Sequence, residues 1–395
     1  MRQFIYIALC TTPTYCGAQL IHYSPIAGGN GHWYESVKSP TTLAWTAARD
    51  AAHARGGYLA TPTSASENLW IFINVAGDSS LWAQNSFGDA VGPYLGGYQD
   101  TTSKDYSEPL GGWTWISGEA WSFAAWHPGQ PNDAGSRNQN HLQYWVDGSA
   151  IPGPTWQDVQ NSTADTSFSY IVEFDYVPSN RPVQFRLDMG GNGHWYEAID
   201  VGEGISWTEA NVQAVAKGGY LTTLTSEIEN QWVFDNIAGD PARWVVDGFG
   251  FHTGPFIGGF QDTESPSYSE PAGGWTWVTG EPWSYTNWAP GQPNNALGGQ
   301  DWLHFWTSDS TMPQPTWQDV PKNNAVNPIS YIIEYEINPL CLADANSDGV
   351  LSPADFSAWI AAFNTQSPAC DQNRDEMCTP ADFSAWVANY NAGCE

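Results

Sequence analysis

The chain has few basic side chains and few charges of any kind. Of its 395 residues, 12 are Lys or Arg and 42 are Asp or Glu, which gives a formal net charge of −30 at pH 7. A field of this sign repels phosphate backbones and anionic lipid surfaces, so the composition argues against nucleic acids and acidic membranes as partners. We interpret the acidic surface as a solubility feature of a secreted protein.

Cysteine is absent from the long central part of the chain. No cysteine lies between Cys16 and Cys341. The bulk of the protein is therefore expected to fold without disulfides and to rely on burial of its apolar side chains.

The last stretch holds four cysteines, which allow three pairings. Cys341 and Cys370 each precede a loop, which favours a bridge between them. Cys378 is expected to point inward, either as a buried thiol or as the partner of Cys394. A solitary Cys394 could instead be a covalent anchoring point, and the sequence leaves this choice open.

Long apolar runs are also missing. No segment approaches the roughly 20 apolar residues that a membrane-spanning helix needs. The N-terminus carries one basic residue, a short apolar run from Phe4 to Leu9 and a small residue at Ala18, which resembles a secretory signal over 1–18. A mis-assigned start codon that clipped the signal is the alternative. We therefore expect an extracellular or cell-surface-associated protein without a transmembrane segment.

The chain is rich in tryptophan, glycine and proline, and it contains two copies of one pattern. The 23 Trp, 39 Gly and 27 Pro residues indicate short strands, many turns and aromatic cores. The clearest recurrences are GGNGHWYE at 28–35 and 190–197, GGWTW at 111–115 and 273–277, and TWQDV at 155–159 and 316–320. Two copies of this length indicate two domains rather than a solenoid, which needs shorter repeats. We place the domains at 28–176 and 189–337, with a linker at 177–188.

Within a copy, the local signals predict an α+β domain. HWYESV at 32–37 is expected to be a strand, and a helix over 45–54 is expected to end at the Gly56-Gly57 pair. A second helix is predicted to begin at a capping box of Ser64 and Glu67, with an apolar face through Leu69 and Phe72. Short aromatic strands follow, the last being YIVEF at 170–174 and YIIEY at 331–335.

Each copy resembles a C-type lectin-like domain of the bacterial, disulfide-free kind over nearly its whole length. The matching pieces are the two-helix opening, LGGYQD and IGGFQD at 95–100 and 257–262, the QPN loops at 130–132 and 292–294, and WQD at 156–158 and 317–319. The resemblance implies that the N- and C-terminal strands pair and that the long loop region carries the ligand site.

The resemblance also implies a set of ligand-binding residues. In sugar-binding members, a Glu-Pro-Asn or Gln-Pro-Asp loop, a later acidic residue and a Trp-Asn-Asp strand hold a calcium ion, and sugar hydroxyls complete its shell. The matching positions are Gln130, Asn132, Gln139, Gln157 and Asp158 in the first copy and Gln292, Asn294, Gln300, Gln318 and Asp319 in the second.

Each of these sets departs from the family pattern by holding a single carboxylate. Charge count is a main control on calcium affinity, so the loops are expected to be weak calcium sites at most. Asp133 and Asp301 lie beside the family positions and could add charge. The same loops could instead bind sugar hydroxyls without metal, with Trp145 or Trp306 stacking on a sugar ring.

The C-terminal stretch carries two calcium-loop patterns. DANSDGVLSPAD places oxygen ligands at the EF-hand spacing, with a glycine at position 6, and DQNRDEMCTPAD repeats the pattern with Glu376 at that position. The predicted metal ligands are Asp344, Asn346, Asp348, Val350 (backbone carbonyl), Ser352 and Asp355 in the first loop and Asp371, Asn373, Asp375, Met377, Thr379 and Asp382 in the second.

Each calcium loop is expected to run into a helix, capped by Ser352 or Thr379 with a proline at the first helical position. This small all-α module at 341–395 resembles a dockerin of the Gly-Cys-ending type. The resemblance implies calcium-dependent docking to a cohesin-like or cell-envelope partner. A module of this size is expected to need calcium to fold.

The sequence contains no Gly-x-Ser-x-Gly, HExxH or Walker motif. The acidic pairs Glu108/Glu119 and Glu270/Glu281 could be read as a glycosidase couple, but both lie by turns. We therefore predict a secreted, non-enzymatic adhesion or binding protein with a glycan ligand. A scaffold component whose lectin-like domains bind a protein ligand without calcium is the alternative.

Overall fold

The computed structural model describes residues 20–25, 28–134, 138–148, 151–162, 167–248, 250–296, 298–308, 312–321, 328–346, 351–373 and 377–393. One compact unit spans Leu20–Glu336, and residues from Ile337 onward belong to another. The predicted signal segment at 1–18 lies outside the described residues.

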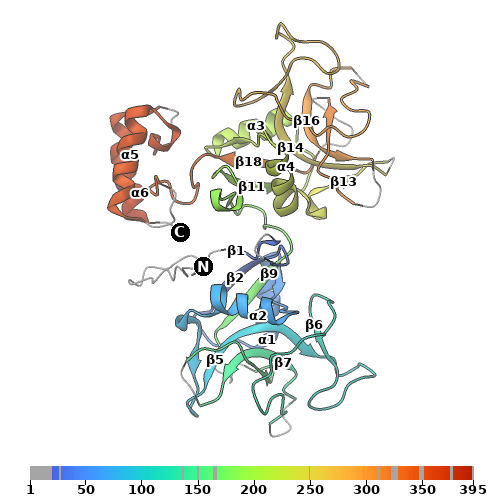
Figure 1. Cartoon of the computed structure of the whole chain (residues 1–395), viewed down its shortest axis with the longest axis vertical. Helices are drawn as coiled ribbons and strands as arrows, with labels where there is room; N and C mark the ends of the chain where they lie inside the picture. Colours follow the sequence, from blue (N-terminus) through green and yellow to red (C-terminus); the bar gives the residue numbers. More distant parts are fainter. Residues whose placement is uncertain are drawn as a thin grey trace. The chain divides into compact units, whose positions relative to one another are not determined.

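The first copy forms one mixed sheet flanked by two helices (Figure 1). Its strands lie in the order β1-β2-β9-β5-β7-β8, with β3 paired to β9 and β4 and β6 paired to β5. The elements are β1 (Ile21–His22), β2 (Trp33–Lys38), α1 (Trp45–Ala54), β3 (Tyr58–Leu59), α2 (Ala65–Ile71), η2 (Phe72–Ala76), η3 (Ser79–Leu81), β4 (Ala83–Gln84), β5 (Ala90–Gln99), β6 (Trp113–Trp115), β7 (His141–Val146), β8 (Trp156–Val159) and β9 (Ser169–Phe174).

The second copy repeats this topology as β10-β11-β18-β14-β16-β17. Its first strand, β10, lies inside the stretch expected to be a linker. The elements are β10 (Val183–Gln184), η4 (Leu187–Met189), β11 (Trp195–Asp200), α3 (Trp207–Ala216), β12 (Tyr220–Leu221), α4 (Glu227–Val233), η5 (Phe234–Ala238), η6 (Pro241–Arg243), β13 (Val245–Val246), β14 (His252–Gln261), β15 (Trp275–Trp277), β16 (Trp302–Thr307), β17 (Trp317–Val320) and β18 (Ser330–Tyr335).

The first and last long strands of each copy pair, as the resemblance implied. Strands β2 and β9 are antiparallel, with Trp33 opposite Phe174, and β11 and β18 repeat the arrangement with Trp195 opposite Tyr335. This pairing closes each domain by joining its ends, so the long loop region between them is held on a single frame.

The helix predictions are confirmed for α1 and need correction for α2. Helix α1 covers 45–54, and Gly56 follows its C-cap with φ +83°, a left-handed conformation that suits glycine. Ser64 caps α2 by accepting from the Glu67 backbone N–H, but the Glu67 carboxylate accepts from the Thr63 backbone N–H at 2.8 Å instead of completing the box. Leu69 is 49% exposed, so the buried face of this helix does not run through it.

Indole rings in edge-to-face and tilted contacts pack together in each long loop region. In the first copy, Trp156 is fully buried and meets Trp115 edge to face, with ring centres 5.8 Å apart. Trp121 packs on Trp115 at 4.3 Å, and Trp126 meets Trp156 at 6.0 Å. The second copy repeats these contacts around Trp317. The heavy use of tryptophan is therefore structural in these loops.

Side chains from both copies hold the segment between the two sheets. The guanidinium group of Arg243 is buried and donates to the backbone carbonyls of Val177, at 2.7 Å, and Ile237. Arg181 donates to the buried carboxylate of Glu35 at 2.6 Å. The segment is thus tied down by hydrogen bonds at several points.

The C-terminal part forms two helices, α5 (Pro353–Thr365) and α6 (Pro380–Ala392), with the short helix η7 (Pro368–Cys370) between them. As predicted, Ser352 and Thr379 cap the two helices, and Trp359 and Trp386 are buried in their shared core. Within the described residues, no helix has the length and apolar character needed to cross a membrane.

The disulfide expectation for the C-terminal part was wrong. Cys370 is bonded to Cys378, with their Cα atoms 5.5 Å apart, and not to Cys341. Cys378 is the eighth residue of the second C-terminal calcium-loop pattern, and Cys370 immediately precedes that pattern. Their Cα atoms lie at an ordinary separation for a disulfide. Cys378 is therefore neither a free thiol nor the partner of Cys394, which lies outside the described residues.

Candidate functional site

A buried carboxylate fixes the shape of each QPN loop. Asp158, on β8, is 2% exposed and accepts hydrogen bonds from the backbone N–H groups of Asn132, at 3.0 and 3.1 Å, and Asp133, at 2.7 Å. Burial raises the pKa of Asp158, and the two backbone N–H groups partly offset this. Asp319 makes the same contacts with Asn294 and Asn295.

The asparagine of each loop is exposed and closes a local turn. The Oδ1 atom of Asn132 accepts from the Ala134 backbone N–H at 2.9 Å, and Asn294 does the same with Ala296 at 2.8 Å. This is an Asx turn, which occupies the side-chain oxygen. The amide nitrogens of Asn132 and Asn294 have no partner within the described part of the chain and are free to donate to a ligand.

The later glutamine of the predicted set behaves differently in the two copies. Gln139 lies in the first loop, where its Oε1 atom accepts from the Ala134 backbone N–H at 2.5 Å. The corresponding Gln300 is buried and donates through Nε2 to the Asp319 carbonyl at 3.3 Å. Its Oε1 atom is buried and has no hydrogen-bond partner among the described residues.

The structure does not bring Gln157 and Gln318 to the loops. Each stands next to its aspartate on a strand, where successive side chains point to opposite faces of the sheet. Gln318 lies opposite His304 on β16. These two glutamines therefore line the other face of the sheet.

The second loop offers oxygen atoms that a cation could use, and the first offers fewer. Besides Gln300 Oε1, the Oε1 atom of Gln292 and the Oδ1 atom of Asp301 are buried without a hydrogen-bond partner in the described residues. The pKa of Asp301 is raised by burial and by the nearby charges of Glu270 and Asp319, which a cation would relieve.

In the first QPN loop, the described oxygens that are buried without a hydrogen-bond partner are two amide oxygens, those of Gln130 and Asn140. Both oxygens of Asp158 already accept backbone N–H groups. The extra carboxylate of the first loop, Asp133, already accepts from the Gln139 backbone N–H at 3.1 Å, whereas the buried Oδ1 atom of Asp301 has no partner among the described residues. The donor set of the second QPN loop therefore fits calcium better than that of the first.

The aromatic residues that were expected to stack on a sugar near these loops are not available to do so. Trp145 and Trp306 are each only 7% exposed. Trp145 meets His127 edge to face at 5.0 Å, and Trp306 meets Phe251 at 5.3 Å. Both rings belong to the framework beneath the loops.

In the C-terminal part, the residues predicted at the last position of each calcium loop form helix caps. Asp355 accepts from the Ser352 backbone N–H at 2.7 Å, and Asp382 accepts from Thr379 at 2.7 Å and from Gln372 at 2.9 Å. Burial acts to raise the pKa of Asp382, but the hydrogen bonds from Thr379 and Gln372 outweigh it, so the pKa is lowered.

The remaining loop positions are only partly described. Asp344 is buried at the start of the first loop, and Asn346 and Asn373 are exposed. Asp371 and Ser352 are half-buried, and Met377 is exposed. Asp348, Val350 and Asp375 lie outside the described residues. Within the described ranges, no group of three or more His, Cys, Asp or Glu side chains is arranged to hold a metal ion.

A buried polar network that the sequence analysis missed recurs in both copies. His32 Nδ1 lies 2.6 Å from a carboxylate oxygen of Glu173, and the Tyr34 hydroxyl donates to Glu67 at 2.7 Å and to Glu173 at 3.0 Å. His194 and Glu334 repeat the first contact at 2.6 Å. The GNGHWYE repeat carried the histidine and tyrosine, but their partners lie on distant segments.

Comparison with known proteins finds sequence relatives and solved structures that are similar to this chain. No protein-family model matches the chain. It is 33% identical over 122 residues to a perlucin-like protein of Mytilus galloprovincialis, a match that covers 31% of this chain and 65% of that protein. It is 31% identical over 93 residues to a type-2 ice-structuring protein of Brachyopsis segaliensis, covering 24% and 43% respectively. The chain therefore covers less than two thirds of each of these relatives.

Solved structures similar to the chain include a calcium-independent type II antifreeze protein, at 23% identity and a TM-score of 0.25, covering 36% of this chain and 85% of that one. The C-type lectin CEL-I from Cucumaria echinata is 20% identical with a TM-score of 0.25, covering 36% and 89%. The sequence relatives and the observed topology together support a C-type lectin-like fold in a mixed α/β chain with two tandem sheets.

Proposed function

We propose that the protein is a secreted, non-enzymatic glycan-binding protein that binds sugar hydroxyls through its two QPN loops. The observation that carries this proposal is the exposed amide nitrogen of Asn132 and of Asn294, each held on a loop that a buried aspartate fixes. A preformed donor of this kind loses little conformational entropy when it binds. Its amide can approach a hydroxyl without any metal.

Of the two QPN loops, we assign calcium a role only in the second. Gln292, Gln300 and Asp301 would hold the ion there, because their buried oxygens lack partners within the described ranges. When bound, calcium would offer coordination positions to sugar hydroxyls and would neutralise the acidic cluster around Asp301. The first loop would then bind its glycan by hydrogen bonds alone.

A glycan array probed with the full chain tests the proposal. Replacing Asn132→Ala together with Asn294→Ala is expected to remove the glycan signal, because both donors are lost. Asn74→Ala is the matched control, since this asparagine is exposed on η2 and its side chain donates to the Trp70 carbonyl at 2.8 Å. Capture of a protein ligand that is indifferent to competing sugars and to the double variant would favour the scaffold function instead.

For the C-terminal part, we propose a dockerin-like module that calcium folds and that docks to a cohesin-like or cell-envelope partner. The support is that Asp344 and Asp355, the first and last ligands predicted for one loop, are both buried carboxylates. The backbone N–H of Asn346, at the third position of this loop, donates to Asp355 at 3.5 Å, which supports a loop that closes on its last position. Calcium titration of the full chain by calorimetry, with Asp344→Ala as the variant, should show one ion fewer than the unaltered protein. An unchanged stoichiometry would remove the assignment.

A further inference from the structure

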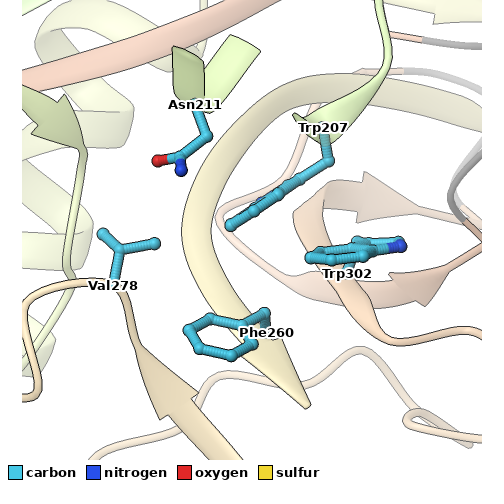
Figure 2. Close-up of a pocket in the computed structure, with 5 residues that line it drawn as sticks. All are labelled: Trp207, Asn211, Phe260, Val278 and Trp302. Carbon is cyan, nitrogen blue, oxygen red and sulfur yellow. The ribbon is translucent and has the colours of Figure 1, made fainter. Parts of the chain in front are cut away.

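The second domain contains an aromatic pocket that does not belong to the QPN loop. It lies between α3 and the strands β14 and β16, and its volume is about 340 Å³ (Figure 2). The lining residues are Trp207, Asn211, Phe260, Val278 and Trp302. This volume falls at the lower end of the range for small-molecule sites, about 300–1,000 Å³.

The aromatic wall of the pocket is held in place before any ligand arrives. The Trp207 indole donates to the Ile257 carbonyl at 2.8 Å and stacks on Trp302 at 4.5 Å. Phe260 continues the wall, with its ring centre 6.4 Å from that of Trp302. Because these side chains are already fixed, a ligand can bury apolar surface against them with little loss of side-chain conformational entropy.

The first domain has a pocket at the same place, but its mouth carries charges. Trp45, Tyr98, Ile116 and His141 occupy the positions of Trp207, Phe260, Val278 and Trp302, and the volume is about 540 Å³. Arg49, Asp50 and His53 also line this pocket, and Arg49 donates to Asp50 at 2.6 Å.

The second domain has lost those charges. Asn211, Val212 and Val215 stand where the first domain has Arg49, Asp50 and His53. Val212 is 62% exposed and Val215 47% exposed. Helix α3 thus presents an uncharged and partly apolar rim, although the chain as a whole carries a net charge of −30.

The pocket and the loop lie on opposite faces of the same strands. Trp302 is opposite Val320, and Leu303 is opposite Asp319, in the pairing of β16 with β17. Neighbouring residues on a strand point to opposite faces, so the side chains of Trp302 and Asp319 diverge. A ligand in the pocket therefore does not touch the loop carboxylate.

The single amide in the pocket indicates what kind of ligand it takes. The side chain of Asn211 has no hydrogen-bond partner within the described residues, and Figure 2 shows it reaching toward the space bounded by Val278, Trp207 and Phe260. A pyranose ring with equatorial hydroxyls has faces made only of C–H bonds, which suit the negative faces of aromatic rings. Its hydroxyls lie at the rim, where one amide can donate and accept.

We propose that this pocket is a second carbohydrate subsite, which binds one neutral pyranose ring of the β-glucose type against the half-buried rings of Phe260 and Trp302, with Asn211 as its polar contact. Trp207 is only 4% exposed and supports these rings from behind. The absence of charge among the lining residues disfavours uronic or sulfated sugars, because nothing there would pair with an anion. The subsite stands independently of the function proposed for the loops.

Titration of the full chain with methyl β-D-glucopyranoside, followed by NMR, tests the proposal. We expect shifts of the Trp207 and Trp302 indole N–H signals and of the Asn211 side-chain amide, with a dissociation constant in the millimolar range, about −4 kcal/mol. The double variant Asn211→Arg with Val212→Asp installs the pair that the first domain carries on a helix of the same fold, and it is expected to weaken binding about tenfold or more.

Two further arms separate this subsite from its alternatives. The variant Asn294→Ala is expected to leave the pocket shifts unchanged, so a failure of the loop proposal does not affect this one. Absence of indole shifts with the glucoside would overturn the subsite. Shifts produced by N-acetylphenylalanine amide but not by the glucoside would also overturn it and would assign the pocket to an aromatic peptide side chain.

Discussion

Both carboxylate oxygens of Asp158 accept from the backbone N–H of Asn132, and each lies within 3.1 Å of its nitrogen. Replacing Asp158 by Ala would leave two partly buried backbone N–H groups without this acceptor. We expect the free energy of unfolding of the first domain to fall by about 1–3 kcal/mol and its glycan signal to disappear. Urea denaturation measures the first effect. Asp147→Ala, at an exposed turn, is the control and should change stability by no more than about 0.5 kcal/mol.

Calcium binding should differ between the two QPN loops because their additional carboxylates stand at different positions: Asp133 accepts from the Gln139 backbone N–H, whereas Asp301 Oδ1 has no partner among the described residues. Asn140 in the first copy stands where Asp301 stands in the second. Asp301→Asn is expected to remove one calcium ion from the stoichiometry measured by calorimetry on the full chain, because it removes the uncommitted carboxylate. The reciprocal change, Asn140→Asp, should add affinity to the first loop. Equal titrations for Asp301→Asn and the unaltered chain would count against calcium in the second loop.

The pair of His194 and Glu334 should make the second domain lose stability as pH rises. The hydrogen bond to Glu334 raises the pKa of His194, and burial offsets this only in part. Because the folded pKa lies above the unfolded value of about 6.5, the stabilisation is complete below that pH and is lost as pH rises through the folded value. Melting temperatures between pH 6 and 8 measure the slope. His194→Gln should flatten it, and an unaltered slope would show that the pair does not titrate in this range.

His304 should produce the opposite slope on the acid side. Burial lowers the pKa of this histidine to about 4. The folded state therefore binds its proton less readily than the unfolded state does. Stability is lost as pH falls from about 6.5 to 4, by on the order of 3 kcal/mol at the end of that range.

The variant His304→Gln tests this, because the first domain carries Gln143 at the same place. Chemical denaturation at pH 4 and pH 7 should show a smaller difference for the variant than for the unaltered chain. Burial also lowers the pKa values of His22 and His141 in the first domain to about 4. These two histidines will still contribute to the measured difference in stability between pH 4 and pH 7. A difference that persists in full would assign the acid sensitivity to these two.

Arg243 should control the mobility of the segment between the two sheets. Its buried guanidinium group holds the Val177 carbonyl, whereas the first domain has Leu81 at the corresponding end of η3. Arg243→Leu would keep an apolar body in the site and remove the hydrogen bond. We expect faster amide exchange and faster proteolysis over residues 175–182, with little change inside the sheets. Unchanged amide exchange would show that the ion pair of Arg181 and Glu35 is enough to hold the segment in place.

Much of the framework follows from local signals. The span of α1 is set by its apolar spacing and by Gly56, and the caps of α5 and α6 are set by Ser352 and Thr379. These features depend on residues a few positions apart, which is why the sequence predicts them. Side chains alternate between the two faces of strand β8, and this alternation also follows from the sequence. It predicts that Gln157 points away from the QPN loop if Asp158 points toward it.

Contacts between distant segments could not be predicted from the sequence in the same way. The sequence shows that Asp158 is acidic, but its backbone partners at 132 and 133 depend on how the loop returns to the strand. The pocket beside Trp207 gathers side chains from α3, β14 and β16, and no local pattern links them. The Cys370–Cys378 bond likewise depends on the path of one short loop.

The packed indole rings of the long loop regions stabilise the lectin-like part without any cysteine. Nothing between Cys16 and Cys341 can be oxidised to a disulfide or reduced from one. The lectin-like part should therefore hold its shape equally in a reducing cytosol, during export and in an oxidising exterior. The C-terminal helices, which are tied by Cys370 and Cys378, should not. One polypeptide thus combines a large part whose fold does not depend on redox conditions with a C-terminal part whose fold does.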